Sequence, residues 1–197
     1  MRLLLGTRNR GKIVEIKRLF HDLPKVELLT WEEVHFSPVE ETGESFLENA
    51  LLKARRISEE TGLPVLAEDA GLEVEALGGR PGVRSARFAG EEATDRENIQ
   101  KLLTELSGVE NRRARFRAVA VVRFPEGKEL IAEGELRGTI AAAPRGHTGF
   151  GYDPVFIPEG FSKTLAELGL EVKNRISHRA QALRRLKELL RRELETR

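Results

Sequence analysis

The chain has 197 residues, enough for one domain with a substantial core, and its 33 lysines and arginines nearly balance 32 aspartates and glutamates. That balance argues against a dedicated nucleic-acid or membrane-surface protein, although a local basic pocket for an anionic small molecule remains compatible with it. Cysteine is absent, which excludes disulfides, thiolate catalysis and zinc–cysteine sites.

The first stretch predicts a strand at Leu3–Leu5, followed by a glycine-bounded basic loop, residues 6–12. Four apolar residues then recur at helical spacing and predict an amphipathic helix: Ile13, Ile16, Leu19 and Phe20. Such a loop before a helix is typical of a phosphate cradle, because helix N-termini attract anions. The sequence of this loop nearly matches the P-loop motif, but Ile13 occupies the position at which that motif has Ser or Thr. The opening apolar run is too short for a signal sequence or a membrane span, so we expect a soluble, cytoplasmic protein.

A second predicted strand, Val26–Leu29, leads into a long irregular stretch, residues 30–44, that carries Glu40 and Glu41. The next segment, residues 45–48, spells a capping box and predicts a helix to about Thr61. Its buried stripe consists of Phe46, Ala50, Ala54 and Ile57. Asn49 and Lys53 share a neighbouring face, which is either solvated or turned into a cleft.

Two adjacent carboxylates, Glu68 and Asp69, follow the short apolar run Val65–Ala67 and precede Gly71. We interpret the run as a buried strand that ends at the carboxylates. In open α/β sheets ligands bind outside the carboxyl ends of the strands, which favours a catalytic role. An ordinary polar exit from a strand is the alternative.

The remaining elements alternate between strands and helices. After a short strand at Leu72–Val74 and a multi-glycine turn, the pattern predicts a helix from about Asp95 to Leu106 and a strand at Arg115–Phe124. A hairpin partner at Glu129–Glu135 and a separate strand at Gly138–Ala143 follow. The chain is therefore predicted to be α/β or mixed α+β, with two lobes whose boundary the sequence does not assign.

Two later segments are candidate binding loops. In residues 144–154, glycines allow close backbone approach, and Phe150 or Tyr152 would stack on a planar base. The alternative is that these aromatics pack against the strand that follows. Further on, Ser177 is a predicted N-cap, which places His178 and Arg179 in the first turn of the last helix. Cations are unfavourable there, so we interpret them as contacts for an anionic or carbonyl-bearing ligand.

Six segments, in order and at compatible spacings, resemble the signatures of the inosine/xanthosine triphosphate pyrophosphatase family: Thr7–Lys12; Glu41–Gly43 with Ser45–Ala50 and Lys53–Ala54; Glu68–Leu72; Ser85–Arg87; Phe150–Pro154; and Ser177–Arg179. The resemblance implies one domain over residues 1–197, with two lobes around a long central mixed sheet and a substrate cleft between them. It also implies a homodimer and Mg²⁺-dependent hydrolysis of ITP, dITP and XTP to the nucleoside monophosphate and pyrophosphate, which cleanses the nucleotide pool.

The resemblance also assigns roles to residues of this chain. Asp69 is the implied catalytic base and a metal ligand, together with Glu41 or its neighbour Glu40. The implied triphosphate contacts are Thr7, Arg8, Asn9, Arg10, Gly11, Lys12 and Lys53. The implied base pocket comprises Phe150, Gly151, Tyr152, Asp153, Lys173, His178 and Arg179. Glu68 and Ala70 depart from the common Asp-Asp-Ser-Gly pattern, so a ligand contact at Ala70 must come from its backbone.

The chemistry of these residue types agrees with that reading. Phosphate transfers need positioned cations and an oriented nucleophile, and carboxylates with several waters suit Mg²⁺. Donors such as Lys173, His178 or Arg179 would accept a 6-oxopurine and reject the amino group of adenine. Two other functions stay open: a P-loop-type ATPase or phosphotransferase, and a non-catalytic nucleotide- or RNA-binding module that uses Arg115, Arg117 and Arg123. Clustered acids weigh against the second, because acids repel phosphates unless a metal intervenes.

Overall fold

The computed structural model describes residues 1–196. The chain divides into two compact units. Unit 1 comprises Met1–Asp69, Ala118–Gly134 and the described residues from Arg179 onward, and unit 2 comprises Ala70–Arg117 and Glu135–His178. Each unit is described by itself below.

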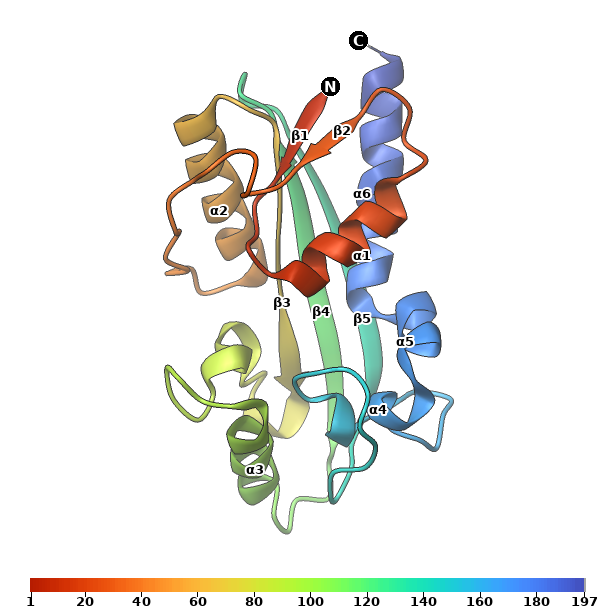
Figure 1. Ribbon diagram of the computed structural model, residues 1–197. Helices are drawn as coiled ribbons and strands as arrows, with labels where there is room; N and C mark the ends of the chain where they lie inside the picture. The colour runs from red at the N-terminus through yellow and green to blue at the C-terminus, as the bar shows by residue number, and fades with distance from the viewer. Residues whose placement is uncertain (197) are drawn as a thin grey trace. The chain divides into compact units, whose positions relative to one another are not determined.

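The strands form one six-stranded sheet in the order β2-β1-β3-β4-β5-β6 (Figure 1). Their bounds are β1 Arg2–Leu5, β2 Glu27–Leu29, β3 Val65–Val74, β4 Arg113–Arg123, β5 Glu129–Ile140 and β6 Phe156–Pro158. Strand β1 pairs in parallel with β2 and β3, whereas β5 and β6 are antiparallel. The sheet is mixed and helices accompany it, which confirms the predicted fold class.

Two of the predicted strand ends are wrong, and both errors involve a glycine. Strand β3 continues through Gly71 to Val74, so Glu68 and Asp69 lie within the strand and not at its end. Likewise, β5 runs without a break from Glu129 through Gly138 to Ile140. A Cβ atom at Gly138 would stand 2.2 Å from the carbonyl oxygen of Ile157 on β6. Glycine is needed there because a neighbouring strand lies close, and the chain does not turn.

Unit 1 contains helices α1 (Arg10–Phe20) and α2 (Phe46–Thr61) and nearly all of α6 (His178–Glu195). The predicted stripe of α2 is confirmed, since each of its members is buried: Phe46, Ala50, Ala54 and Ile57. The helix begins where expected, with the Ser45 side chain accepting a hydrogen bond from the amide of Glu48. The second hydrogen bond of the capping box differs from the expected one. The Glu48 carboxylate accepts from the amide of Glu44 and not from that of the N-cap, Ser45.

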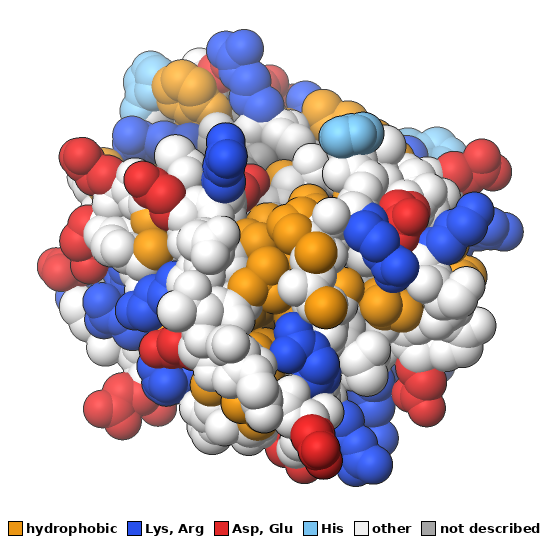
Figure 2. All heavy atoms as spheres, turned by 90° about the horizontal axis from the view of Figure 1, so that it is seen from below, with side chains coloured by type: hydrophobic (Ala, Val, Ile, Leu, Met, Phe, Trp, Pro, Cys, Tyr) orange, Lys and Arg blue, Asp and Glu red, His pale blue; other side chains and the backbone are white. Residues whose placement is uncertain are grey.

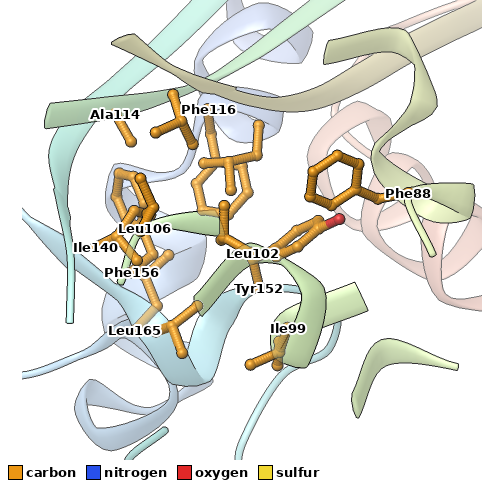
Figure 3. Packing of buried hydrophobic residues seen from close by; sticks show 13 residues of the cluster. Phe88, Ile99, Leu102, Leu106, Ala114, Phe116, Ile140, Tyr152, Phe156 and Leu165 are labelled. Atoms are coloured by element: carbon orange, nitrogen blue, oxygen red, sulfur yellow. The ribbon is translucent and has the colours of Figure 1, made fainter. Parts of the chain in front are cut away.

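Unit 2 contains helices α3 (Asp95–Glu105), α4 (Leu165–Leu168) and α5 (Leu170–Ile176), with short 3₁₀ turns at Glu75–Leu77, Gly82–Arg87 and Asp153–Val155. A full capping box, formed by Thr94 and Glu97, fixes the start of α3 at Asp95, where this helix was predicted to begin. The hydrophobic core of unit 2 is drawn in Figure 3, where Leu102 of α3 and Leu106, the residue that follows this helix, pack with Phe116 of β4. This core also surrounds the ring of Tyr152.

Strand β4 was predicted from its alternation, and its second half is buried on both faces. Val119 and Val121, which occupy the expected outward positions, are 1% and 0% exposed. On the face drawn in Figure 2, basic and acidic side chains are interspersed around a central group of hydrophobic ones, in keeping with the near-zero net charge. Within residues 1–196, no helix is long and apolar enough to cross a membrane.

Candidate active site

The loop between β1 and α1 presents the N-terminus of a helix. Asn9 caps α1, and its side chain accepts a hydrogen bond of 3.0 Å from the amide of Lys12. Lys12, which was predicted within the loop, therefore lies in the first helical turn. Gly6 is packed tightly, since a Cβ there would stand 3.0 Å from Cγ1 of Val65. The loop thus brings the N-terminus of a helix and a lysine to one place, as an anion site requires.

The two carboxylates lie just beyond the carboxyl end of β1. Leu5, the last residue of β1, pairs with Leu66 of β3, so Glu68 and Asp69 extend past the point where the parallel pairing stops. Ligands bind at the carboxyl ends of parallel strands, and the strand that ends beside these carboxylates is β1. The sequence had predicted that β3 ends there.

Glu68 is buried and paired with two cations. Its Oε1 accepts a hydrogen bond of 2.7 Å from Nε of Arg179 and lies 3.1 Å from Nζ of Lys12. Burial by itself would raise the pKa of this carboxyl, but the charges of Lys12 and Arg179 lower it to about 2. The other oxygen, Oε2, is buried and has no hydrogen-bond partner within residues 1–196.

Asp69 has the opposite electrostatic character. Burial raises its pKa to about 6, with Lys53 opposing the rise and Glu41 adding to it. Asn49, which is fully buried, donates from Nδ2 to Oδ2 of Asp69 over 3.1 Å and accepts from the amide of Gly43 over 2.7 Å. The open question about Asn49 is thereby decided in favour of the buried position. A carboxylate with a pKa near neutrality suits a general base.

Lys53 links Glu41 to the backbone of strand β3. Its Nζ lies 2.8 Å from Oε1 of Glu41 and donates to the backbone carbonyl of Glu68. The neighbouring Glu40 is exposed. Of the two candidate metal ligands, Glu41 is thus the one held beside the Asp69 cluster, by which we mean Asp69 with Asn49 and Lys53.

Arg179 needs no ligand to balance its charge, contrary to the expectation from the helix dipole. Besides Glu68, it contacts Oε2 of Glu15 on α1, 3.3 Å from its Nη1. Glu15 did not emerge from the sequence, although its position three residues after Lys12 places both on one helical face. Protein carboxylates therefore offset the cation at the start of α6.

A magnesium ion fits the acids of this cluster. The donors are hard oxygens, and the carboxylates of Glu41 and Asp69 lie close enough for the charge of Glu41 to raise the pKa of Asp69. Among residues 1–196 no group of three or more His, Asp or Glu side chains encloses a metal by itself. Mg²⁺ usually retains waters and takes one or two carboxylates together with substrate phosphates, so Glu41 and Asp69 are suitable ligands.

The second candidate segment lies in unit 2 and presents an exposed aromatic ring. The side chain of Phe150 is 59% exposed, and Nζ of Lys173 lies 4.1 Å from its ring centroid. Asp153 is 3% exposed and accepts hydrogen bonds from Nζ of Lys173 and from the amide of Phe150. The amide of Gly151 donates to Oδ2 of Asp95 over 2.8 Å.

Tyr152 occupies a different environment from Phe150. Its ring is buried in the core of unit 2, where Figure 3 shows its hydroxyl end directed toward Phe88, and the hydroxyl donates to the carbonyl of Ser85 over 2.6 Å. His178 is also buried, with its ring stacked on Phe116 at 4.8 Å between centroids. Phe150 is therefore the aromatic candidate for stacking on a base, and the binding role of Tyr152 stays a prediction.

The other predicted contacts are dispersed. Oγ1 of Thr7 accepts from the amide of Asn9, and Arg10 lies on the surface, 3.8 Å from Glu32. Gly11 lies in the first turn of α1, and Ala70 is a half-buried residue of β3. Arg8 contacts Trp31 and Phe36.

Comparison with known proteins identifies close relatives. The sequence model of the Ham1 family matches residues 3–189. The dITP/XTP pyrophosphatases of Aquifex aeolicus and Geobacter sulfurreducens are 50% and 49% identical, and each alignment covers 96% of this chain and 96% of the relative. A Ham1 protein from Coxiella burnetii has a similar structure, with a TM-score of 0.91 and 42% identity over 96% of this chain and 98% of the other. A nucleoside-triphosphatase / dITP/XTP pyrophosphatase from Mycobacterium abscessus gives a TM-score of 0.82 and 42% identity, with 96% and 100% covered.

Proposed function

The chain belongs to the Ham1 family, and from this membership and the unit 1 cluster we propose that it hydrolyses dITP, ITP and XTP to the nucleoside monophosphate and pyrophosphate. The observation that carries the proposal is the cluster around Asp69, a buried carboxylate whose pKa is raised to about 6 by burial. Its neighbour Glu68 pairs with Lys12, and Glu41, whose charge acts on Asp69, pairs with Lys53. A base and two cations are what hydrolysis of a phosphoric anhydride requires of a protein.

The reaction follows from these residues. Asp69 accepts a proton from water as the water oxygen bonds to the α-phosphorus, and the bond from that phosphorus to the bridging oxygen breaks, which releases pyrophosphate. Asn49 holds the Asp69 carboxylate in place through its hydrogen bond. Lys12, Lys53 and the amides at the start of α1 stabilise the phosphate oxygens.

We assign Mg²⁺ as the cofactor, with Glu41 and Asp69 as its protein ligands. When bound, Mg²⁺ neutralises charge on the phosphate oxygens and acidifies water. The ionised Glu68, whose pKa lies well below that of Asp69, holds Arg179 and Lys12 in place.

For the base, the proposal assigns the residues of unit 2 that carry an exposed ring and donors. Phe150 offers a stacking face, and Lys173 beside it supplies a donor to the 6-oxo group. Adenine presents an amino group at that position, so ATP would leave a donor facing a donor. We also propose that the protein is a homodimer, that it is cytoplasmic and that it removes these nucleotides from the nucleotide pool.

Neither alternative function gains an observation in its favour. Ile13 is 9% exposed and belongs to the core, so it offers no hydroxyl to a P-loop metal. The arginines suggested for RNA binding are held by carboxylates: Arg115 and Arg117 contact Glu73, and Arg123 contacts Glu129.

The test is incubation of the purified protein with dITP, XTP, GTP and ATP, with and without Mg²⁺, while pyrophosphate and orthophosphate are assayed separately. We expect metal-dependent pyrophosphate from dITP and XTP, little from ATP, and none from the Asp69→Asn variant. Orthophosphate from ATP would instead establish an ATPase, and absence of turnover with every triphosphate would refute the proposal.

A further inference from the structure

We propose that Arg8 is a positioning residue, which holds the segment Thr30–Glu44 so that Glu41 is presented to Lys53 and the Asp69 cluster. The inference rests on the proposed function only in assigning Glu41 to the metal. It changes the role that the family resemblance implies for Arg8, from a triphosphate contact to a support for another residue.

Among residues 1–196, the guanidinium of Arg8 makes one hydrogen bond and two ring contacts, each with this segment. Its guanidinium carbon lies 5.9 Å from the ring centroid of Trp31 and 5.6 Å from that of Phe36, and its Nη2 donates to the carbonyl of Phe36 over 2.5 Å. Two ring faces and a carbonyl are what a planar guanidinium recognises, and a lysine ammonium does not reproduce this geometry.

The first part of the segment is fixed to the core of unit 1. Phe36 is 7% exposed and packs with Leu4, Ile57 and Val65, and Trp31 packs partly against the same cluster. Arg8 covers these two rings from the loop that follows β1. The N-terminal half of the segment is thereby tied to the same loop that leads into α1.

The second part of the segment is anchored at both of its ends. Ser37 donates to the carboxylate of Glu60 at its start, and the amide of Gly43 donates to Asn49 at its end. Glu41 lies between these anchors and has Lys53 as its ion-pair partner. Residues 37–43 have no helix or strand of their own, so the anchors set where Glu41 lies. Releasing Arg8 loosens the anchor at Phe36, immediately before Ser37.

The experiment compares Arg8→Ala and Arg8→Lys with wild type and with Arg2→Ala. Arg2 is a matched control, since it is an exposed arginine on β1 whose partner, Glu27, is 3.6 Å away. Trp31 is the only tryptophan of the chain, so acrylamide quenching of its fluorescence reports on this contact in ligand-free protein. Amide hydrogen exchange of residues 37–43 and the Mg²⁺ concentration for half-maximal dITP hydrolysis complete the measurements.

We expect both Arg8 variants to increase the quenching of Trp31, to speed exchange at residues 37–43 and to raise the half-saturating Mg²⁺ concentration several-fold, with Arg2→Ala like wild type. Wild-type Mg²⁺ dependence in Arg8→Lys, with a raised KM for dITP only in Arg8→Ala, would show a phosphate contact and overturn the proposal. Unchanged quenching and exchange in both variants would overturn it as well. If wild type hydrolyses no triphosphate, the proposed function fails, while quenching and exchange still decide whether Arg8 holds the segment.

Discussion

The buried pairing of Glu68 makes a strong prediction for the variant Glu68→Gln. The amide keeps the size of the side chain but removes the charge that Arg179 and Lys12 contact at 2.7 and 3.1 Å. The pKa of Glu68 is lowered from 4.5 to about 2, and that difference corresponds to about 3 kcal/mol of folding free energy at neutral pH. Removing one partner of a buried ion pair typically costs about 3–5 kcal/mol, which agrees.

Equilibrium unfolding in urea at pH 7 measures the effect. We expect Glu68→Gln to lose about 3 kcal/mol, or about 6–12 °C in Tm for a chain of this size. The control Glu27→Gln removes the carboxylate of an exposed pair with Arg2 and should change little.

The pH dependence adds a second check of the same reasoning. Because the pKa of Glu68 is lower in the folded chain, its stabilisation is complete above pH 4.5 and is lost as the pH falls toward 2. The difference between wild type and Glu68→Gln should shrink over that range. A loss no larger than that of Glu27→Gln at pH 7, or a difference independent of pH, would refute the buried pairing.

Three further variants test other parts of the site. Asp69→Asn should abolish pyrophosphate release yet stabilise the metal-free protein at pH 8 by about 1–3 kcal/mol. The reason is that the raised pKa of Asp69 makes its ionised form costly in the folded chain once the pH exceeds about 6. Equal stability of the variant and wild type at pH 8 would contradict the raised pKa. Phe150→Ala should raise KM for dITP by about 5- to 150-fold, the contribution of one stacked base. Its stability should be unchanged, since Phe150 is 59% exposed. Tyr152→Phe should lower the unfolding free energy by about 1–3 kcal/mol, because the buried carbonyl of Ser85 loses its donor; an unchanged urea midpoint would count against that bond.

Helices α1, α2, α3 and α6 follow from local sequence, whereas the short helices α4 and α5 were not predicted. The stripe of α2 and the apolar side of α3 recur at a spacing that only a helix places on one face, and the caps at Ser45 and Thr94 mark where each begins. The candidate cradle after β1 and the adjacent acids Glu68 and Asp69 were predicted from the sequence for the same reason. Each is a contiguous pattern that can be recognised in the sequence without reference to distant residues.

Tertiary structure decided the features that depend on a distant neighbour. Glycine permits both a turn and a close approach, and only the position of β6 shows that Gly138 serves the second purpose. From the sequence, the charge of Arg179 predicted a ligand contact. In the fold, Glu68, 111 residues away along the chain, lies within hydrogen-bond distance and offsets that charge. Phe150 and Tyr152 are close in sequence, yet one ring is exposed and the other lies in the core. Local pattern determines which elements form, whereas burial and charge pairing at each side chain are set by residues that the fold brings from elsewhere in the chain.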